Sequence, residues 1–521
     1  MKRKWVSAVL AAILVMSLLG GCSKQEAPKE ETKVTSAPNS EGETGQEEGG
    51  NGQIDFNEEP YTINFPVITF GDIPADLQLV EDGINEIVLP KINAKIKLDV
   101  ISAMEMTNVY TLRASSGEKL DLLLLLPTST TLMPLVSTNM ILPMNELVDQ
   151  WGQNIQSDLG DILEVGKVNG NLYVIPGLDG SGASIPGIEF NAELVKKYDL
   201  EDEIRNLKSI NDLEPILALV KEKEPNVIPF SSTNSGTGYT QLLGGFDTLG
   251  DSFGALEYGS SDEFGIINQY ESERFLEYCK LMRDWYQKGY ISKDTLTSQD
   301  TGISLAQAGK VFCVIDTYNP INDYGFDLAN PTDGMVEWPL SGYTAYNSTN
   351  NISVYGLAIS VTCERPDKVM QFLNLLYSDP AAVSLLYRGI EGKHYSITAD
   401  GLIQQDNKSG YYLLLDTISD YRLIPTKAEL GIDFKDRKAE FEAKGKDSPA
   451  LGFTFDSSSY ANEIAACNAV KAEYYNVIDC GAVDPEVEIP KFVEKLKAAG
   501  LDTIMKAKQQ QLNDWVNSQG Q

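Results

Sequence analysis

A cysteine near the N-terminus has the clearest chemical role in this sequence. It closes the motif Leu19-Gly-Gly-Cys22, after an apolar stretch that starts at Val6 behind three basic residues at positions 2–4. A short basic region, an apolar region and small residues before a cut are the features of an export signal. A cysteine directly after the cut can carry a lipid on its thiol. The pattern predicts a signal peptide over residues 1–21 and a mature N-terminus at Cys22, anchored by acyl chains such as palmitate.

The segment after this cysteine is polar. Residues 23–53 are rich in Ser, Lys, Glu, Gly and Gln and hold almost no apolar side chains, so they cannot bury enough surface to offset the entropy of ordering. We expect a disordered linker over residues 22–53 that tethers the folded part to the outer face of the cell membrane. The alternative is a transmembrane anchor, but about 15 apolar residues are fewer than the roughly 20 needed to span a bilayer.

A second possible chemistry is nucleophilic hydrolysis. Gly250-Asp-Ser-Phe-Gly254 matches the pattern G-x-S-x-G, and an acid and His394 follow it in an order that hydrolases use. This motif needs a buried strand directly before the serine, whereas residues 242–249 contain two glycines and an aspartate. We therefore interpret the match as accidental, His394 as structural, and the protein as no enzyme. A glycosidase with paired carboxylates stays open, because the separation of acids is not visible in a sequence.

The supply of metal ligands is poor. The chain has one histidine and no C-x-x-C motif, so we expect no zinc site and no cofactor. Five cysteines besides Cys22 lie far apart, at positions 279, 313, 363, 467 and 480. Cys467 and Cys480 could form a disulfide outside the cell, although buried free thiols are the favoured interpretation.

Length and charge limit the number of domains and the class of binding partner. About 470 of the 521 residues follow the linker, which is enough for two lobes or two domains. The formal net charge of −33 is spread along the chain, and it argues against nucleic acid as a partner. This charge says little about a small ligand.

Apolar periodicity after residue 60 alternates strands with helices, which predicts an α/β fold. Residues 121–126 and 311–315 read as strands buried on both faces. Asp379-Pro380 is typical of a helix start and Gly389 of a helix end. Further strands are expected at 61–70, 94–100, 172–176, 188–190 and 354–361, and helices at 77–89 (ending at Pro90), 110–115, 192–198, 215–222, 271–287, 366–377 and in the C-terminal part after 492.

Several of these segments, in their order, resemble the extracellular solute-binding proteins of ABC importers. The lipobox (Leu19-Gly-Gly-Cys22) and the polar linker come first. They are followed by Ser115-Ser-Gly-Glu-Lys-Leu-Asp121, Asn169-Gly-Asn-Leu-Tyr-Val-Ile-Pro176 and Val354-Tyr-Gly-Leu-Ala-Ile-Ser360. The helix at 364–377 also resembles that of sugar-type (family 1-like) members, and segments 389–395, 453–456 and 496–502 resemble one lipoprotein branch. The resemblance spans nearly the whole mature chain.

The resemblance implies a two-lobe, type II periplasmic-binding-protein-like α/β fold with a helical C-terminal part. By analogy, lobe 1 comprises residues 54–175 and 347–395, and lobe 2 comprises 176–346 and 396–521. It further implies a hinge near Pro176, Asn347 and Tyr395 that closes on a ligand. The protein would act as a monomer that delivers a sugar or oligosaccharide to ABC permease subunits.

Aromatic and carboxylate side chains are the candidates for a sugar site, because ring faces pack on sugars and carboxylates bind hydroxyl groups. Trp338 is the one tryptophan of the mature chain in a predicted loop, and Tyr318 with Asp316 follows a buried strand, where α/β proteins bind ligands. The Asp179 loop follows the crossing at Pro176. Weaker candidates are Tyr239 and Tyr346.

The ligand and the receiving partner stay open at this point. A peptide or a sugar acid is an alternative ligand, and a sugar acid would need cations in the cleft, of which only Arg113, Arg365 and Arg388 stand out. A sensor that signals to a membrane receptor has the same sequence features as an importer subunit.

Overall fold

The computed structural model describes residues 54–69, 73–103, 105–126, 132–177, 183–232, 238–298, 300–320, 326–329, 331, 334–349, 351, 355–405, 409–411 and 419–519. The predicted signal peptide, the lipidation site at Cys22, the linker and Asp179 lie outside the described residues. Within the described ranges, no helix has the length and the apolar character needed to cross a membrane.

The chain opens with a β-α-β unit. Strand β1 (Tyr61–Thr69) pairs in parallel with β2 (Ala94–Ser102), and helix α1 (Leu77–Ile92) connects them. The sequence placed the end of this helix at Pro90, and this was wrong because Pro90 lies inside the last turn. The helix ends instead at Asn93, which adopts a left-handed conformation (φ 49°) and donates its N–H to the carbonyl of Leu89.

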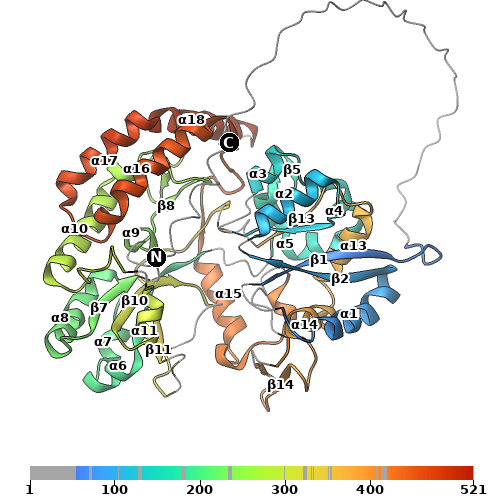
Figure 1. The fold of residues 1–521 in the computed structure, drawn as a ribbon, viewed down its shortest axis with the longest axis horizontal. Coiled ribbons are helices and arrows are strands. Elements are labelled where there is room, and N and C mark those ends of the chain that lie inside the picture. Colours follow the sequence, from blue (N-terminus) through green and yellow to red (C-terminus); the bar gives the residue numbers. More distant parts are fainter. Residues whose placement is uncertain are drawn as a thin grey trace, which may run out of the picture. The chain divides into compact units, whose positions relative to one another are not determined.

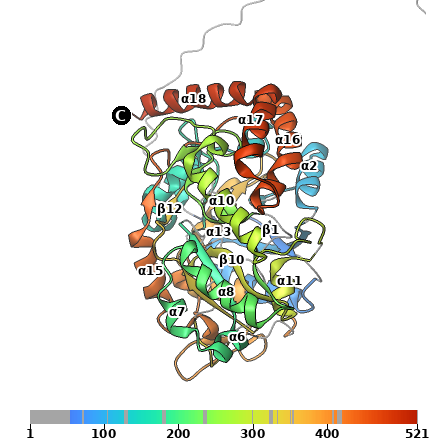
Figure 2. The same cartoon turned by 90° about the vertical axis from the view of Figure 1, so that its left-hand side faces the viewer.

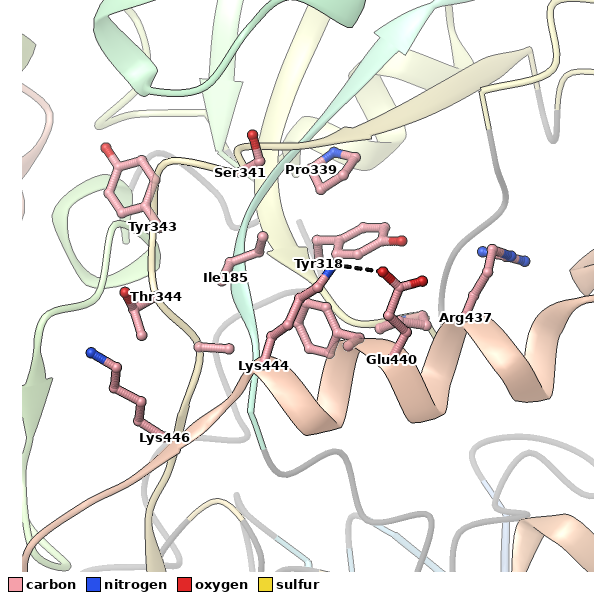
Figure 3. A pocket seen from close by; sticks show the side chains of 13 residues that line it. Ile185, Tyr318, Pro339, Ser341, Tyr343, Thr344, Arg437, Glu440, Lys444 and Lys446 are labelled. Atoms are coloured by element: carbon pink, nitrogen blue, oxygen red, sulfur yellow. Dashed lines mark hydrogen bonds and ion pairs between the residues drawn. The ribbon is translucent and has the colours of Figure 1, made fainter.

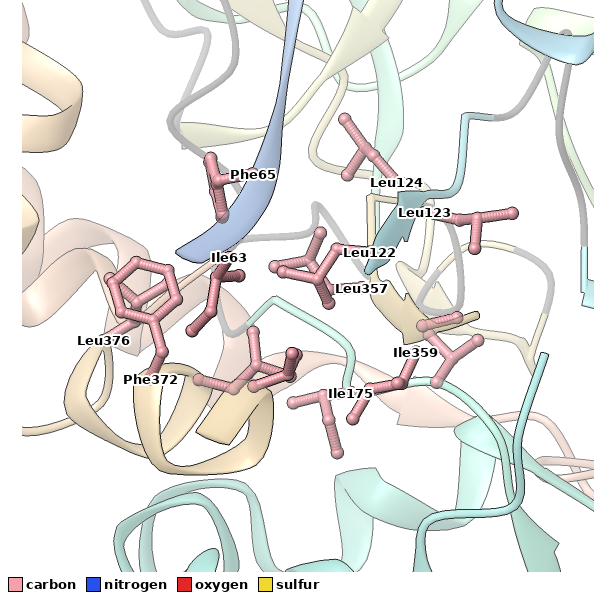
Figure 4. Packing of buried hydrophobic residues seen from close by; sticks show 14 of the residues in the cluster. Ile63, Phe65, Leu122, Leu123, Leu124, Ile175, Leu357, Ile359, Phe372 and Leu376 are labelled. Carbon is pink, nitrogen blue, oxygen red and sulfur yellow. The ribbon is translucent and has the colours of Figure 1, made fainter. Parts of the chain in front are cut away.

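A first hydrophobic core surrounds this unit. Strand β3 (Leu122–Leu124) pairs antiparallel with β13 (Leu357–Ile359), so segments from both ends of the chain share one core. Leu122 of β3 and Leu357 of β13 lie close to Ile63 of β1, with Phe372 of α13 (Pro366–Leu375) beyond it (Figure 4). The other elements around it are α2 (Met106–Ser116), α3 (Leu132–Ser137), α4 (Asn145–Trp151), α5 (Gln153–Leu159), α13 (Pro366–Leu375) and α14 (Pro380–Arg388). This core also contains Tyr411 and Ile424, which lie beyond residue 395, the expected end of lobe 1. The lobe boundaries stay a prediction.

Helix α14 begins and ends as its sequence predicts. The Asp379 carboxylate accepts hydrogen bonds from the backbone N–H groups of Ala381 and Ala382 (both 3.1 Å). Pro380 occupies the first turn, and Gly389, with φ 74°, follows the last residue. Local capping chemistry therefore marks both ends of this helix.

A four-stranded sheet with the strand order β11-β6-β10-β7 forms the second part of the fold (Figure 1). Its strands are β6 (Ile185–Asn191), β7 (Ile228–Ser232), β10 (Val311–Tyr318) and β11 (Met335–Pro339). β10 runs parallel to β7 and antiparallel to β6, which also pairs antiparallel with β11. Further elements along this part of the chain are α6 (Ala192–Tyr198), α7 (Glu201–Arg205), α8 (Glu214–Lys223), α9 (Tyr239–Leu242), α10 (Glu273–Lys288) and α11 (Gly302–Gln307).

The register of this sheet decides which side chains share a face. Tyr318 lies opposite Ile185, and Asp316 lies opposite Gly187. Ile188 lies opposite Trp338 on one side and Ile315 on the other. Because side chains alternate between faces along a strand, Tyr318 and Asp316 share one face, whereas Trp338 lies on the other.

Three C-terminal helices pack side by side (Figures 1 and 2). They are α16 (Ala461–Asp479), α17 (Pro485–Ala499) and α18 (Leu501–Ser518), and their apolar residues build a third core with Phe253 and Phe275. The fully buried Asp479 joins this bundle to α9, because its carboxylate accepts hydrogen bonds from the N–H groups of Gly238 (2.7 Å), Tyr239 (3.1 Å) and Thr240 (2.8 Å). The hydroxyl of Thr240 donates a fourth (2.6 Å).

Short strands and helix α15 are further elements of the described structure. β12 (Tyr346–Asn347) pairs in parallel with β16 (Lys446–Asp447). In the chain, β16 follows helix α15 (Phe434–Lys444). The remaining two-stranded ribbons are β4 (Lys167–Val168) with β5 (Asn171–Leu172), β8 (Phe246–Asp247) with β9 (Leu256–Glu257), and β14 (Tyr395–Ile397) with β15 (Ile403–Gln405). The five cysteines among the described residues are all buried free thiols. Cys467 and Cys480 therefore form no disulfide with each other.

Candidate functional site

A cavity of about 480 Å³ lies beside the sheet, where β10 ends. We call it the Tyr318 cavity. Its walls come from β6, β10, the last residue of β11 and the segment after it, helix α15 and Lys446. Arg437, Glu440 and Lys444 project from α15 on the side where Tyr318 lies (Figure 3). The volume is within the range of small-molecule sites in proteins.

Tyr318 is held in the wall by close packing. Its ring meets that of Phe441 on α15 edge to face, with 5.8 Å between the ring centroids. Gly187, opposite Asp316, leaves the space this arrangement needs: a Cβ there would lie 2.9 Å from the Tyr318 Cβ and 2.9 Å from Glu337 Oε1. A side chain at position 187 would therefore displace Tyr318 or Glu337.

Glu189 and Asp316 are two of the acids on the same sheet face as Tyr318. Burial raises the pKa of the Glu189 carboxyl to about 7, and repulsion from Asp316 adds to this effect. Burial also raises the pKa of the Asp316 carboxyl, although its Oδ1 accepts a hydrogen bond from the N–H of Thr317 (2.7 Å). Neither acid lines the cavity itself. A carboxyl that titrates near neutral pH next to the candidate site gives the folded protein a pH-dependent stability.

We expect the protein to lose stability between about pH 4.5 and 7 through Glu189. The folded state raises the pKa of this group from 4.5 to about 7, so it binds the proton more tightly than the unfolded chain, and the stabilisation present at low pH is lost as the pH rises. The expected loss is on the order of 2 kcal/mol. Denaturant unfolding of the native protein and of Glu189→Gln at pH 5 and pH 8 measures it. An unchanged pH dependence in the variant would contradict this assignment.

A second cavity, of about 400 Å³, lies next to the β12–β16 ribbon. We call it the Tyr346 cavity. Tyr346 and Tyr258 line it, and their rings stack in parallel, with 3.7 Å between centroids and 2° between planes. Lys446 pairs with Tyr346 in the ribbon and lines both cavities. The two cavities are therefore neighbours that share one cationic side chain.

Trp338 is not in a loop, so the expectation that selected it was wrong. It lies in edge strand β11 and packs against the second core. Its indole N–H donates to the Leu207 carbonyl (3.4 Å), and its ring meets that of Phe326 at 5.6 Å. The structure therefore does not bring Trp338 together with Tyr318.

The other candidates are also dispersed. Tyr239 is buried in the second core and contacts the ring of Phe230 (5.6 Å), whereas Tyr346 lies at the second cavity. Neither Arg113 nor Arg365 lines the two cavities, and both form ion pairs, with Asp99 and Glu58 among their partners. Arg388 is buried in helix α14.

The geometry does not assemble a serine hydrolase around Ser252. Both ring nitrogens of the buried His394 are engaged elsewhere, Nδ1 with the N–H of Ile390 (2.8 Å) and Nε2 with the Asp76 carboxylate (3.2 Å). The hydroxyl of Ser252 accepts a hydrogen bond from Lys471 (3.2 Å). His394 is therefore not placed to act as a base for this serine.

The sequence did not predict several of the residues that line the two cavities. Helix α15 is polar, and Phe441 is one of only two aromatic residues in it, so an aromatic side chain in a charged helix was the available signal. Tyr258 and Lys446 lie in or beside two-residue strands that leave no periodic pattern. Their position depends on contacts between distant segments.

Comparison with known proteins identifies relatives of the whole folded part. The family model for the bacterial extracellular solute-binding protein matches residues 80–383, and a domain of unknown function (DUF3502) matches residues 449–517. A carbohydrate ABC transporter substrate-binding protein of Streptococcus pneumoniae serotype 4 (strain ATCC BAA-334 / TIGR4) is 27% identical over 473 residues, which cover 86% of this chain and 90% of the relative.

Solved structures show the same fold. The N-glycan transport solute binding protein NgtS from Streptococcus pneumoniae matches with a TM-score of 0.77 at 24% identity, over 88% of this chain and 100% of that chain. Its complex with Man5GlcNAc matches with a TM-score of 0.66 at 25% identity, over 88% and 99% of the two chains. The likeness confirms the expected two-lobe α/β fold of type II.

Proposed function

The chain belongs to the family of bacterial extracellular solute-binding proteins, and we propose that it captures a carbohydrate and delivers it to an ABC importer. The Tyr318 cavity carries this proposal, because it combines aromatic rings with charged side chains in one site. The similarity to a carbohydrate substrate-binding protein and to the NgtS complex supports the same ligand class.

The chemistry of the cavity walls suits a sugar. Tyr318, Tyr343 and Phe441 supply aromatic surface, which packs on the apolar face of a sugar ring. Glu440 and Ser341 supply oxygen atoms that can accept hydrogen bonds from hydroxyl groups. Tyr346, which the sequence selected, lines the neighbouring cavity and would extend the site.

The lipobox supports a placement at the membrane surface. A lipid on Cys22 and the polar segment that follows would hold the binding part near the importer. In this arrangement the binding protein acts as a monomer outside the cell, and separate permease and energy-coupling subunits move the sugar. Closure of the two lobes around the ligand, at the predicted crossings near Pro176, Asn347 and Tyr395, would present the loaded form to the permease.

A thermal-shift screen of the full chain tests the ligand class. The screen compares mono- and oligosaccharides, sugar acids and short peptides. A ligand at 100 times its dissociation constant stabilises the folded state by about 2.7 kcal/mol, so we expect a clear rise in Tm for one carbohydrate series. A rise with peptides and with no carbohydrate would contradict the proposal and leave the family assignment intact.

A further inference from the structure

We propose that the ligand is an acidic oligosaccharide, and that Lys446 and its neighbours in the Tyr318 cavity bind its anionic sugar unit. This inference rests on the proposed carbohydrate function and narrows the substrate class. It starts from a contrast in charge between the two neighbouring cavities.

The charged side chains of the Tyr318 cavity are mainly basic. Arg437, Lys444 and Lys446 line it together with one acid, Glu440. The Tyr346 cavity has the opposite composition, because Glu257, Glu263 and Asp447 line it with Lys446 as the one base. In a chain with 42 basic and 75 acidic residues, a cavity lined by three bases and one acid is unusual.

Among the described residues, Lys446 differs from the other two cations of this cavity in having no ion-pair partner. Lys444 forms an ion pair with Glu440 (2.7 Å), and Arg437 forms one with Asp433 (3.3 Å). The ammonium group of Lys446 has no ion pair within the part of the chain that the structure describes. The adjacent Asp447 carboxylate accepts a hydrogen bond from the Asn347 side-chain amide (2.8 Å). Lys446 is exposed, and a negatively charged ligand group would give its ammonium group a charge-assisted hydrogen bond.

The position of Lys446 also indicates how such a ligand would lie. The residue belongs to the ribbon between the two cavities and pairs with Tyr346. An anionic sugar in the Tyr318 cavity would place the next, uncharged sugar against Tyr346 and the acids of the second cavity, whose carboxylates accept hydrogen bonds from hydroxyl groups. Tyr258 covers one face of the Tyr346 ring by stacking and so positions this ring for the second sugar.

Calorimetric titration of the full chain with paired oligosaccharides tests the inference. The two members of each pair have equal length and differ in one unit, a hexose or the corresponding hexuronate. We expect the acidic member to bind about tenfold more tightly, as one added charge-assisted hydrogen bond would give. The difference should shrink as salt is raised from low to physiological concentration, because screening weakens exposed charge pairs.

Three variants assign the effect to Lys446. Lys446→Met keeps most of the aliphatic stem and removes the charge, so it should weaken binding of the acidic member about tenfold more than binding of the neutral member and thereby abolish the preference. Lys446→Arg should restore the preference. Lys506→Met is the matched control, since Lys506 is an exposed lysine of α18 that lines neither cavity.

Two results would overturn the inference and leave the proposed function standing. One is equal affinity for the neutral and acidic members, and the other is an equal loss of affinity for both members in Lys446→Met. Failure of every carbohydrate to bind would overturn the proposed function and this inference with it.

Discussion

Replacement of Asp479 by alanine is expected to destabilise the protein by roughly 3–5 kcal/mol, because several buried hydrogen-bond donors lose their acceptor at once. The carboxylate is fully buried and accepts hydrogen bonds from three successive backbone N–H groups at the start of α9 and from the Thr240 hydroxyl. The variant leaves all four donors without this acceptor in a site that water does not reach. Denaturant unfolding measures the loss as a fall in the transition midpoint.

Asp484→Ala provides the matched control for this prediction. Asp484 also accepts a hydrogen bond from a helix N-terminus, that of α17 through the N–H of Glu486 (3.0 Å), but it is exposed. Removal of an exposed helix cap costs about 1 kcal/mol. If the two variants lose the same stability, the buried hydrogen bonds to Asp479 contribute no more than an exposed helix cap, and the prediction is wrong.

Tyr318→Ala is expected to weaken carbohydrate affinity by about 10- to 100-fold, because a stacked aromatic ring contributes on the order of 1.5–3 kcal/mol when it is buried by a ligand. Tyr318 lies in the wall of the larger cavity and is only 8% exposed. Calorimetry with the best sugar from the thermal screen measures the change. Tyr318→Phe keeps the ring and should retain most of the affinity if stacking is the main contribution.

Trp338→Ala separates loss of binding from loss of packing. Trp338 is of comparable size, but it lies on the opposite face of the same sheet and packs against the second core. We expect this variant to lower the Tm and to leave the affinity of the remaining folded protein close to that of the native protein. An affinity loss as large as that of Tyr318→Ala would place Trp338 in the ligand site and contradict the division by sheet face.

Local chemistry explains why much of the fold was predictable. The apolar run at 311–315 and the alternation of strands and helices gave the α/β class, and the cap at Asp379 with Gly389 gave the ends of α14. These signals act within a few residues, so they survive in the sequence. The end of α1 was missed because Pro90 is tolerated inside the last turn and Asn93 ends the helix.

The sequence by itself determined the α/β class, the family resemblance and Tyr318 as a candidate at the end of a buried strand. Only the tertiary structure decided that Trp338 lies on the other sheet face, because a face depends on the register between β6 and its neighbours. The same holds for Phe441 beside Tyr318, for Tyr258 on Tyr346 and for Lys446 between the two cavities. These contacts join segments far apart in the chain, and no local pattern records which distant side chain will fill a given space.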